Sequence, residues 1–192
     1  MLIYNVDYED LLEKGARAYE EKRDLDLALG FLEKAAELNH EDHRQYMIAG
    51  FIYQQEGKLE HAFRLFKMAL KHNPRSSLAW MRMAECLFDL KEYEKALRVI
   101  RKAVELEPSN PKYLDLEGRI LLMMDRFDEA LETYRIALDK SPDSVEALVG
   151  AAWALMMVER PEEALSLNRK ANSLSPENVE VEEQYRSLTS KS

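Results

Sequence analysis

The sequence predicts an all-α fold, a right-handed superhelical solenoid of five helix-turn-helix repeats of 34 residues each. Two alanine series and one series of segment ends carry this prediction, because all three keep the same interval of 34 residues. The three series are Ala28, Ala62, Ala96, Ala130 and Ala164; Ala35, Ala69, Ala103, Ala137 and Ala171; and His40, Pro74, Pro108, Pro142 and Pro176. Arrays of this kind present extended surfaces to other chains and seldom carry chemistry.

The second repeat shows the internal design most completely. Residues 43–55 place small and apolar side chains at helical spacing, and residues 59–72 repeat that spacing in a second helix. Between them, Gly57 allows a tight turn. Pro74 ends the second helix, since proline lacks a backbone donor and disfavours helix at the preceding residue.

Small side chains in the second helix let the two helices of a repeat approach closely. Ala62 and Ala69 have this role, and large neighbours such as Tyr53 and Phe66 fill the remaining space. The fifth repeat departs from the design, because polar Asn168 stands where the other repeats have Leu, Phe, Ile or Tyr. Atypical terminal repeats are expected, since an end repeat lacks one neighbour.

The repeats occupy nearly the whole chain, which predicts a single domain over residues 1–192. A short amphipathic segment that contains Val181 and Tyr185 follows Pro176 and predicts a C-terminal capping helix. The predicted repeats span about residues 9–42, 43–76, 77–110, 111–144 and 145–178, and the predicted capping helix spans about 179–189.

The charge balance argues against a nucleic-acid partner. The net charge is −9 and the isoelectric point is near 5.1, whereas phosphate backbones need a basic footprint. Acidic residues dominate the first repeat and basic residues the second. The basic second repeat either attracts an acidic partner segment or pairs with the acidic first repeat. Pairing with the first repeat is the preferred explanation, because charges on the surface of such arrays are usually solvated.

Several absences favour a cytoplasmic protein that does not insert into membranes. A single cysteine, Cys86, allows no internal disulfide. The first residues have neither the basic start nor the apolar run of a signal peptide. No apolar stretch approaches the roughly 20 residues that a membrane-spanning helix needs.

No candidate catalytic constellation occurs, so we expect neither an enzyme nor a bound cofactor or metal. His40 and His43 are too few ligands for a metal site, and a role in the turn explains them. Cys86 has no positioned base beside it and is expected to be a small buried apolar residue. Phosphate-binding loops rich in glycine are absent.

The pattern resembles the tetratricopeptide repeat family over nearly the whole chain. The residues that carry the resemblance are clearest in the second repeat: Ala49, Gly50, Tyr53, Gly57, Ala62, Phe66, Ala69 and Pro74. Residues 46–96 also resemble the tetratricopeptide chaperones of type III secretion translocators, through the string Ala84-Glu85-Cys86-Leu87. The resemblance implies the fold strongly, whereas function depends on the residues that face the partner.

The side of each first helix that lies opposite its hairpin partner is expected to line a concave groove. This side is rich in apolar and methionine side chains, which tolerate varied ligands. The predicted groove residues are Met47, Phe51, Leu78, Met81, Phe88, Leu122, Met123, Val149, Trp153, Met156 and Met157, with Arg44 and Arg119 as polar members. Contacts with neighbouring repeats are the alternative explanation for any single one of them.

These features predict an interaction scaffold that holds a protein or peptide segment with apolar anchors in the groove. The alternative is a cytoplasmic chaperone for type III secretion clients. A homodimer through the groove or the terminal repeats is a further alternative. We do not expect the groove to bind the C-terminal carboxylate of a partner peptide through basic and Asn side chains. The basic residues of the groove lie in different repeats, and no Asn lies with them.

Overall fold

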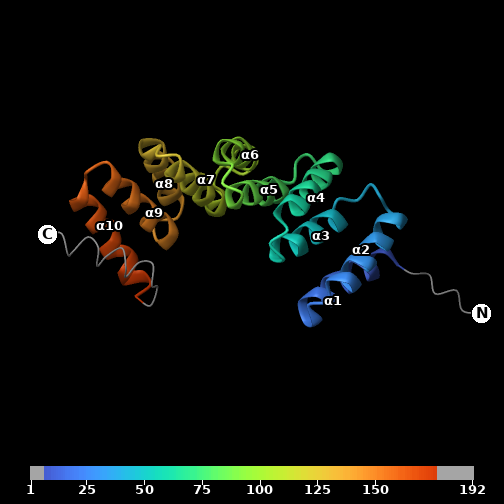
Figure 1. Ribbon diagram of the computed structural model, residues 1–192. Coiled ribbons are helices and arrows are strands. Elements are labelled where there is room, and N and C mark those ends of the chain that lie inside the picture. The colour runs from blue at the N-terminus through green and yellow to red at the C-terminus, as the bar shows by residue number, and fades with distance from the viewer. Residues whose placement is uncertain (1–6, 177–192) are drawn as a thin grey trace, which may run out of the picture. The chain divides into compact units, whose positions relative to one another are not determined.

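The computed structural model describes residues 7–176, and this part of the chain consists of ten helices arranged as hairpins (Figure 1). The chain divides into two compact units, Met1–Glu92 and Tyr93–Ser192, which are described separately. Unit 1 contains α1 (Tyr8–Lys22), α2 (Leu25–Leu38), α3 (Arg44–Gln55), α4 (Leu59–His72) and α5 (Ser77–Asp89). Unit 2 contains α6 (Tyr93–Leu106), α7 (Pro111–Met123), α8 (Phe127–Lys140), α9 (Val145–Met157) and α10 (Pro161–Leu174).

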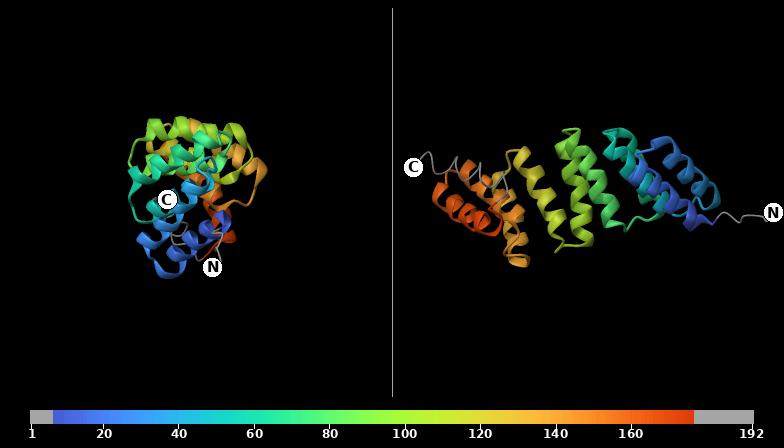
Figure 2. Two further views of the ribbon diagram at one scale, coloured as in Figure 1. Left: turned by 90° about the vertical axis from the view of Figure 1, so that its right-hand side faces the viewer. Right: turned by 90° about the horizontal axis from the view of Figure 1, so that it is seen from below.

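The second helix of every repeat has the same length and the same place in the 34-residue period, from α2 to α10. Each of these helices ends on a hydrogen bond to an alanine carbonyl of the second alanine series; Asn73 N–H, for example, donates to the Ala69 oxygen at 2.8 Å. The first helices α5, α7 and α9 keep the period as well. Within each unit, the helices of successive hairpins lie side by side (Figure 2).

Side-chain caps position the start of the first helices at the same interval. Asp42 accepts from the Arg44 backbone N–H at 2.9 Å, and Ser76 accepts from Ala79 N–H at 3.2 Å. In unit 2, Asn110 and Ser144 have the same role for α7 and α9. Such oxygens satisfy amide groups that have no partner within the helix.

The turn inside each hairpin contains one residue with left-handed backbone, and these residues recur every 34 positions. Only one of the five is glycine, so the other four adopt a conformation that side chains disfavour. Their φ angles lie between 53° and 70°, and the residues are Arg23, Gly57, Lys91, Asp125 and Glu159.

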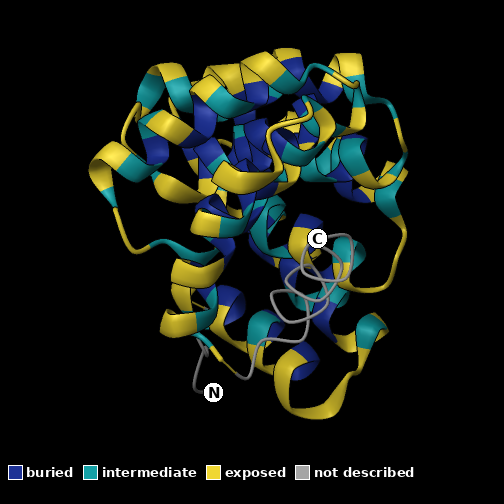
Figure 3. Cartoon of the chain, turned by 90° about the vertical axis from the view of Figure 1, so that its left-hand side faces the viewer, coloured by how far each residue is buried: buried dark blue, intermediate teal, exposed yellow. Residues whose placement is uncertain are grey.

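Within each unit, the core is built as the sequence predicts, from the alanines of the second helices and a large central residue in helices such as α4 and α8. The alanines of the first two series are buried, and Phe66 and Tyr134 at the centre of α4 and α8 are fully enclosed. A Cβ added at Gly50 would lie 2.7 Å from a ring carbon of Phe66. A Cβ added at Gly118 would lie 2.5 Å from Tyr134 Cζ. Glycine in the first helix therefore makes room for an aromatic ring in the second (Figure 3 shows the buried faces).

Asn168 occupies the central core position of α10. Its side chain is fully buried, and within the described part of the chain neither its amide nitrogen nor its amide oxygen has a hydrogen-bond partner. Buried amide groups without partners are costly, so this position is a weak point of unit 2. The predicted capping helix at 179–189 lies outside the described residues.

Candidate functional site

In unit 1, the predicted groove residues differ in exposure. Phe51 on α3 and Leu78 on α5 are exposed, whereas Met47 and Phe88 are half-buried. Met81 is buried. A buried side chain cannot meet a partner, so Met81 is left out of the candidate surface and counted with the core.

A polar cluster joins α3 to α5 beside Phe51. The Arg82 guanidinium lies 5.2 Å from the centre of the Phe51 ring. Arg82 also donates to Glu85 Oε2 at 3.0 Å, and Gln54 Nε2 donates to the same oxygen at 3.1 Å. A cation over an aromatic face is attracted to it, so the cluster fixes the orientation of the exposed ring.

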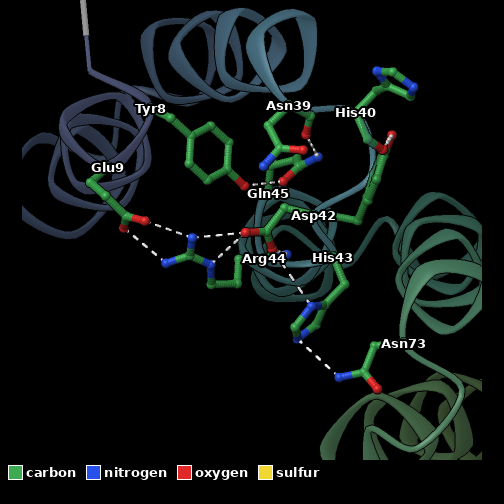
Figure 4. A network of polar contacts seen from close by, with 10 residues as sticks. Tyr8, Glu9, Asn39, His40, Asp42, His43, Arg44, Gln45 and Asn73 are labelled. Atoms are coloured by element: carbon green, nitrogen blue, oxygen red, sulfur yellow. Dashed lines mark hydrogen bonds and ion pairs between the residues drawn. The ribbon is translucent and has the colours of Figure 1, made fainter.

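Arg44 lies in a network between α1 and α3 (Figure 4). Its Nη2 atom lies 2.6 Å from Glu9 Oε1 and 2.7 Å from Asp42 Oδ2. Its guanidinium also lies 5.3 Å from the centre of the Tyr8 ring. These contacts link the first two repeats and occupy the guanidinium, so Arg44 is better explained as a structural residue than as a polar groove residue.

The same network shifts the pKa values of Asp42 and Tyr8. The hydrogen bonds from Arg44 hold the pKa of Asp42 below its usual range. Burial, together with the negative charge of Asp42, raises the pKa of Tyr8 to about 12. The Tyr8 hydroxyl donates to Gln45 Oε1, and Gln45 in turn donates to the Asn39 carbonyl at 2.9 Å. The hydroxyl thus belongs to the joint between the first two repeats.

In unit 2, three large apolar side chains of the predicted set are exposed on the first helices. Met123 at the end of α7 is 52% exposed, and Trp153 and Met157 on α9 are 47% and 46% exposed. We call these three residues the Met–Trp patch. Met123 and Met157 lie 34 residues apart and hold equivalent positions on α7 and α9, which contact each other.

The other predicted residues of unit 2 are less accessible. Leu122 and Met156 are half-buried, and Met156 packs against a core cluster of α9 and α10. Val149 is buried in a second cluster with Leu148 and Ala171, so it too is left out of the candidate surface. Arg119 is exposed on α7, with Nη1 3.9 Å from Asp115 Oδ2.

Two exposed carboxylates that were not predicted as site residues follow the methionines of the Met–Trp patch in the sequence. Asp125 and Glu159 follow Met123 and Met157 by two residues each, both are exposed, and both have left-handed backbone. The 34-residue spacing of these turn residues was available in the sequence. Without a glycine at either position, however, it gave no sign of a special conformation.

Each unit also has a small apolar cleft between successive second helices. The cleft of unit 2 has a volume of about 320 Å³ and lies between α8 and α10 over α9. The cleft of unit 1 has about 180 Å³ and holds the equivalent place between α2 and α4 over α3. The rim of the larger cleft is occupied by ion pairs, such as Lys170 with Asp143 at 2.9 Å.

The histidines and the cysteine have structural surroundings. His61 stacks on Tyr53 and His72 on Tyr46, each at 5.4 Å between ring centres. Burial raises the pKa of the Cys86 thiol to about 12, which leaves it protonated and unreactive. Among residues 7–176, no group of three or more His, Cys, Asp or Glu side chains is placed to hold a metal ion.

None of the helices between residues 7 and 176 combines the length and the apolar character that crossing a bilayer requires.

Several solved structures have similar folds. YrrB, whose structure is described as that of a TPR protein with an unusual peptide-binding site, shares 24% identity over 92% of this chain and 91% of its own, with a TM-score of 0.76. MamA shares 18% identity over 88% of this chain and 92% of its own, with a TM-score of 0.78. TTC0263, a TPR protein of Thermus thermophilus, shares 22% identity over 95% of this chain and 99% of its own, with a TM-score of 0.70. These likenesses confirm the predicted all-α repeat solenoid.

A search of curated protein sequences finds no match. Two family models, both described as tetratricopeptide repeat, match residues 53–120 and 116–179. Together with the recurring helices, turns and alanines, these matches show that the chain belongs to the tetratricopeptide repeat family.

Proposed function

We propose that this protein is an interaction scaffold whose first helices bind an extended or helical segment of a partner protein through exposed apolar side chains. The single observation that supports the proposal most is the Met–Trp patch, since three large apolar side chains stay about half exposed on neighbouring first helices. Exposed apolar patches and aromatic anchors are typical of protein interfaces.

The fold supports the same conclusion. Repeat solenoids of helix hairpins act mainly as protein-binding scaffolds, and the solved structure of YrrB is described as having a peptide-binding site. In unit 1, the exposed Phe51 ring and Leu78 offer a second apolar surface on first helices. Location in the cytoplasm, the predicted homodimer and the chaperone role suggested by residues 46–96 stay predictions.

The test is affinity capture from the native cell, followed by mass spectrometry. The full chain is compared with a double variant, Trp153→Ala with Met157→Gln. The matched control is Met68→Gln, because Met68 is an exposed methionine of a second helix, α4. We expect the wild type and the control to retain the same partner and the double variant to lose it, with an unchanged unfolding midpoint. Retention of that partner by the double variant would overturn the proposal for unit 2.

A further inference from the structure

We infer that the Met–Trp patch of unit 2 binds a basic amphipathic segment of a partner protein, with the basic side chains of that segment beside Asp125 and Glu159. The inference rests on the proposed function and adds the chemistry of the bound segment. The contacts all lie within unit 2, on α7, α9 and the turns that follow them.

The apolar half of the site is a short row on two adjacent helices. Trp153 and Met157 are separated by one helical turn on α9 and lie on one face. Met123 holds the position on α7 that Met157 holds on α9, and the two helices contact each other. A tryptophan flanked by flexible methionines suits the apolar face of a helix in a groove, where the partner side chains vary in shape.

The charged half of the site consists of carboxylates without ion-pair partners among residues 7–176. Neither Asp125 nor Glu159 forms a salt bridge there, and both are exposed. The adjacent arginines are occupied, because Arg126 contacts Glu129 at 2.6 Å and Arg160 contacts Glu163 at 2.7 Å. Each methionine of the patch is therefore followed, two residues later, by a carboxylate that can attract a cation.

Charge also argues against two other occupants of the patch. A second copy of the chain has a net charge of −9 and only its second repeat is basic, so it complements the two carboxylates less well than a basic segment does. The chain's own C-terminal residues are a poor fit for the same reason, since Glu177, Glu180, Glu182 and Glu183 follow one another closely. A partner segment with lysine or arginine beside its apolar residues complements both halves of the site.

The test uses isothermal titration of the full chain with two synthetic peptides of about 18 residues, both with leucines at helical amphipathic spacing. One peptide has lysine and the other glutamate at all remaining positions. We expect the lysine peptide to bind at least about tenfold more tightly, and its affinity to fall as salt rises from about 0.05 to about 0.15 M.

Four variants locate the binding. Met157→Gln is expected to weaken the lysine peptide about tenfold, since it removes an apolar contact, whereas Met68→Gln on α4 leaves the affinity unchanged. Glu159→Gln is expected to weaken it about threefold. Its control is Glu162→Gln, which removes the same charge from the first turn of the second helix α10.

The outcomes separate the inference from the proposed function. If the glutamate peptide binds equally well and Met157→Gln weakens it, the preference for a basic segment is overturned while apolar binding at the patch stands. If Met157→Gln has no effect on any peptide, the patch is not the site. A dimer in sedimentation experiments that Met157→Gln dissociates would assign the patch to a second copy and overturn the inference.

Discussion

The ring of Tyr134 on α8 lies against the backbone of Gly150 on α9, the first helix of the next repeat. A Cβ added at Gly150 would lie 2.5 Å from the Tyr134 hydroxyl oxygen. The same ring also lies against Gly118 of its own hairpin. One fully buried aromatic residue therefore joins three helices of unit 2, and two glycines make the joint possible.

Gly150→Ala should lower the free energy of unfolding by about 1–3 kcal/mol, because the enclosed Tyr134 ring has no space to retreat from the new methyl group. Urea denaturation followed by circular dichroism measures the effect. Gly30→Ala on α2 is the matched control. A Cβ at that position meets nothing within 4 Å, so helix propensity should increase stability by about 0.5–1 kcal/mol. A loss of similar size in both variants would contradict the account of Gly150.

Asn168→Leu should stabilise the protein by about 1–3 kcal/mol, because it removes two buried amide atoms that have no hydrogen-bond partner among the described residues. A higher midpoint in thermal and urea unfolding would show this. Asn172→Leu, on the same helix but only half-buried, is the comparison and should change stability little. Destabilisation by Asn168→Leu would indicate that the amide has a partner after all.

Lys91→Gly should raise the free energy of unfolding by about 1 kcal/mol, because Lys91 adopts a left-handed backbone with φ of 61° that glycine accepts at no steric cost. The measurement is the midpoint of chemical unfolding. Gly57→Ala is the reciprocal change at the equivalent turn, where φ is 70°, and should destabilise by a similar amount. The explanation fails if both substitutions shift the midpoint in the same direction.

Tyr8→Phe should reduce the loss of stability at alkaline pH. The pKa of Tyr8 is raised to about 12 in the folded chain, mainly by burial, from an ordinary value of 10.0. The contribution of the neutral Tyr8 phenol to the free energy of unfolding is therefore fully present below pH 10. It is lost as the pH rises from about 10 to about 12. Urea midpoints for wild type and variant across this range should converge as the pH increases. Parallel curves would show that the phenol is not held in its neutral form.

The sequence predicted the second helices most reliably, since alanine at two fixed positions and proline at the end mark both their packing face and their end. The turns were harder to predict. Only Gly57 signals its left-handed backbone, whereas Lys91 and Glu159 adopt the same conformation without glycine.

The exposure of the candidate surface was predicted only in part. Helical spacing alone distinguishes the hairpin side of a first helix from the opposite side, and Trp153 and Met157 on that opposite side are exposed. Spacing does not show how closely neighbouring helices pack, and contacts between helices accompany the burial of Met81 and Val149. Nor does it show that Arg44 reaches Glu9, because that ion pair joins residues 35 positions apart.

The recurring caps and left-handed turns also bear on how such a chain changes length during evolution. Loss of residues 111–144 by recombination would join Asn110 to Val145, and an asparagine oxygen would then stand where Ser144 now caps α9. Duplication of the same block would keep both existing joints and add one new joint, Ser144 to Pro111, where a serine oxygen would stand in the capping position that Asn110 holds for α7. Gain or loss of whole 34-residue blocks therefore keeps a capping side chain at the start of each first helix. The fit between a glycine of one helix and an aromatic ring of its neighbour then decides which blocks can lie next to each other.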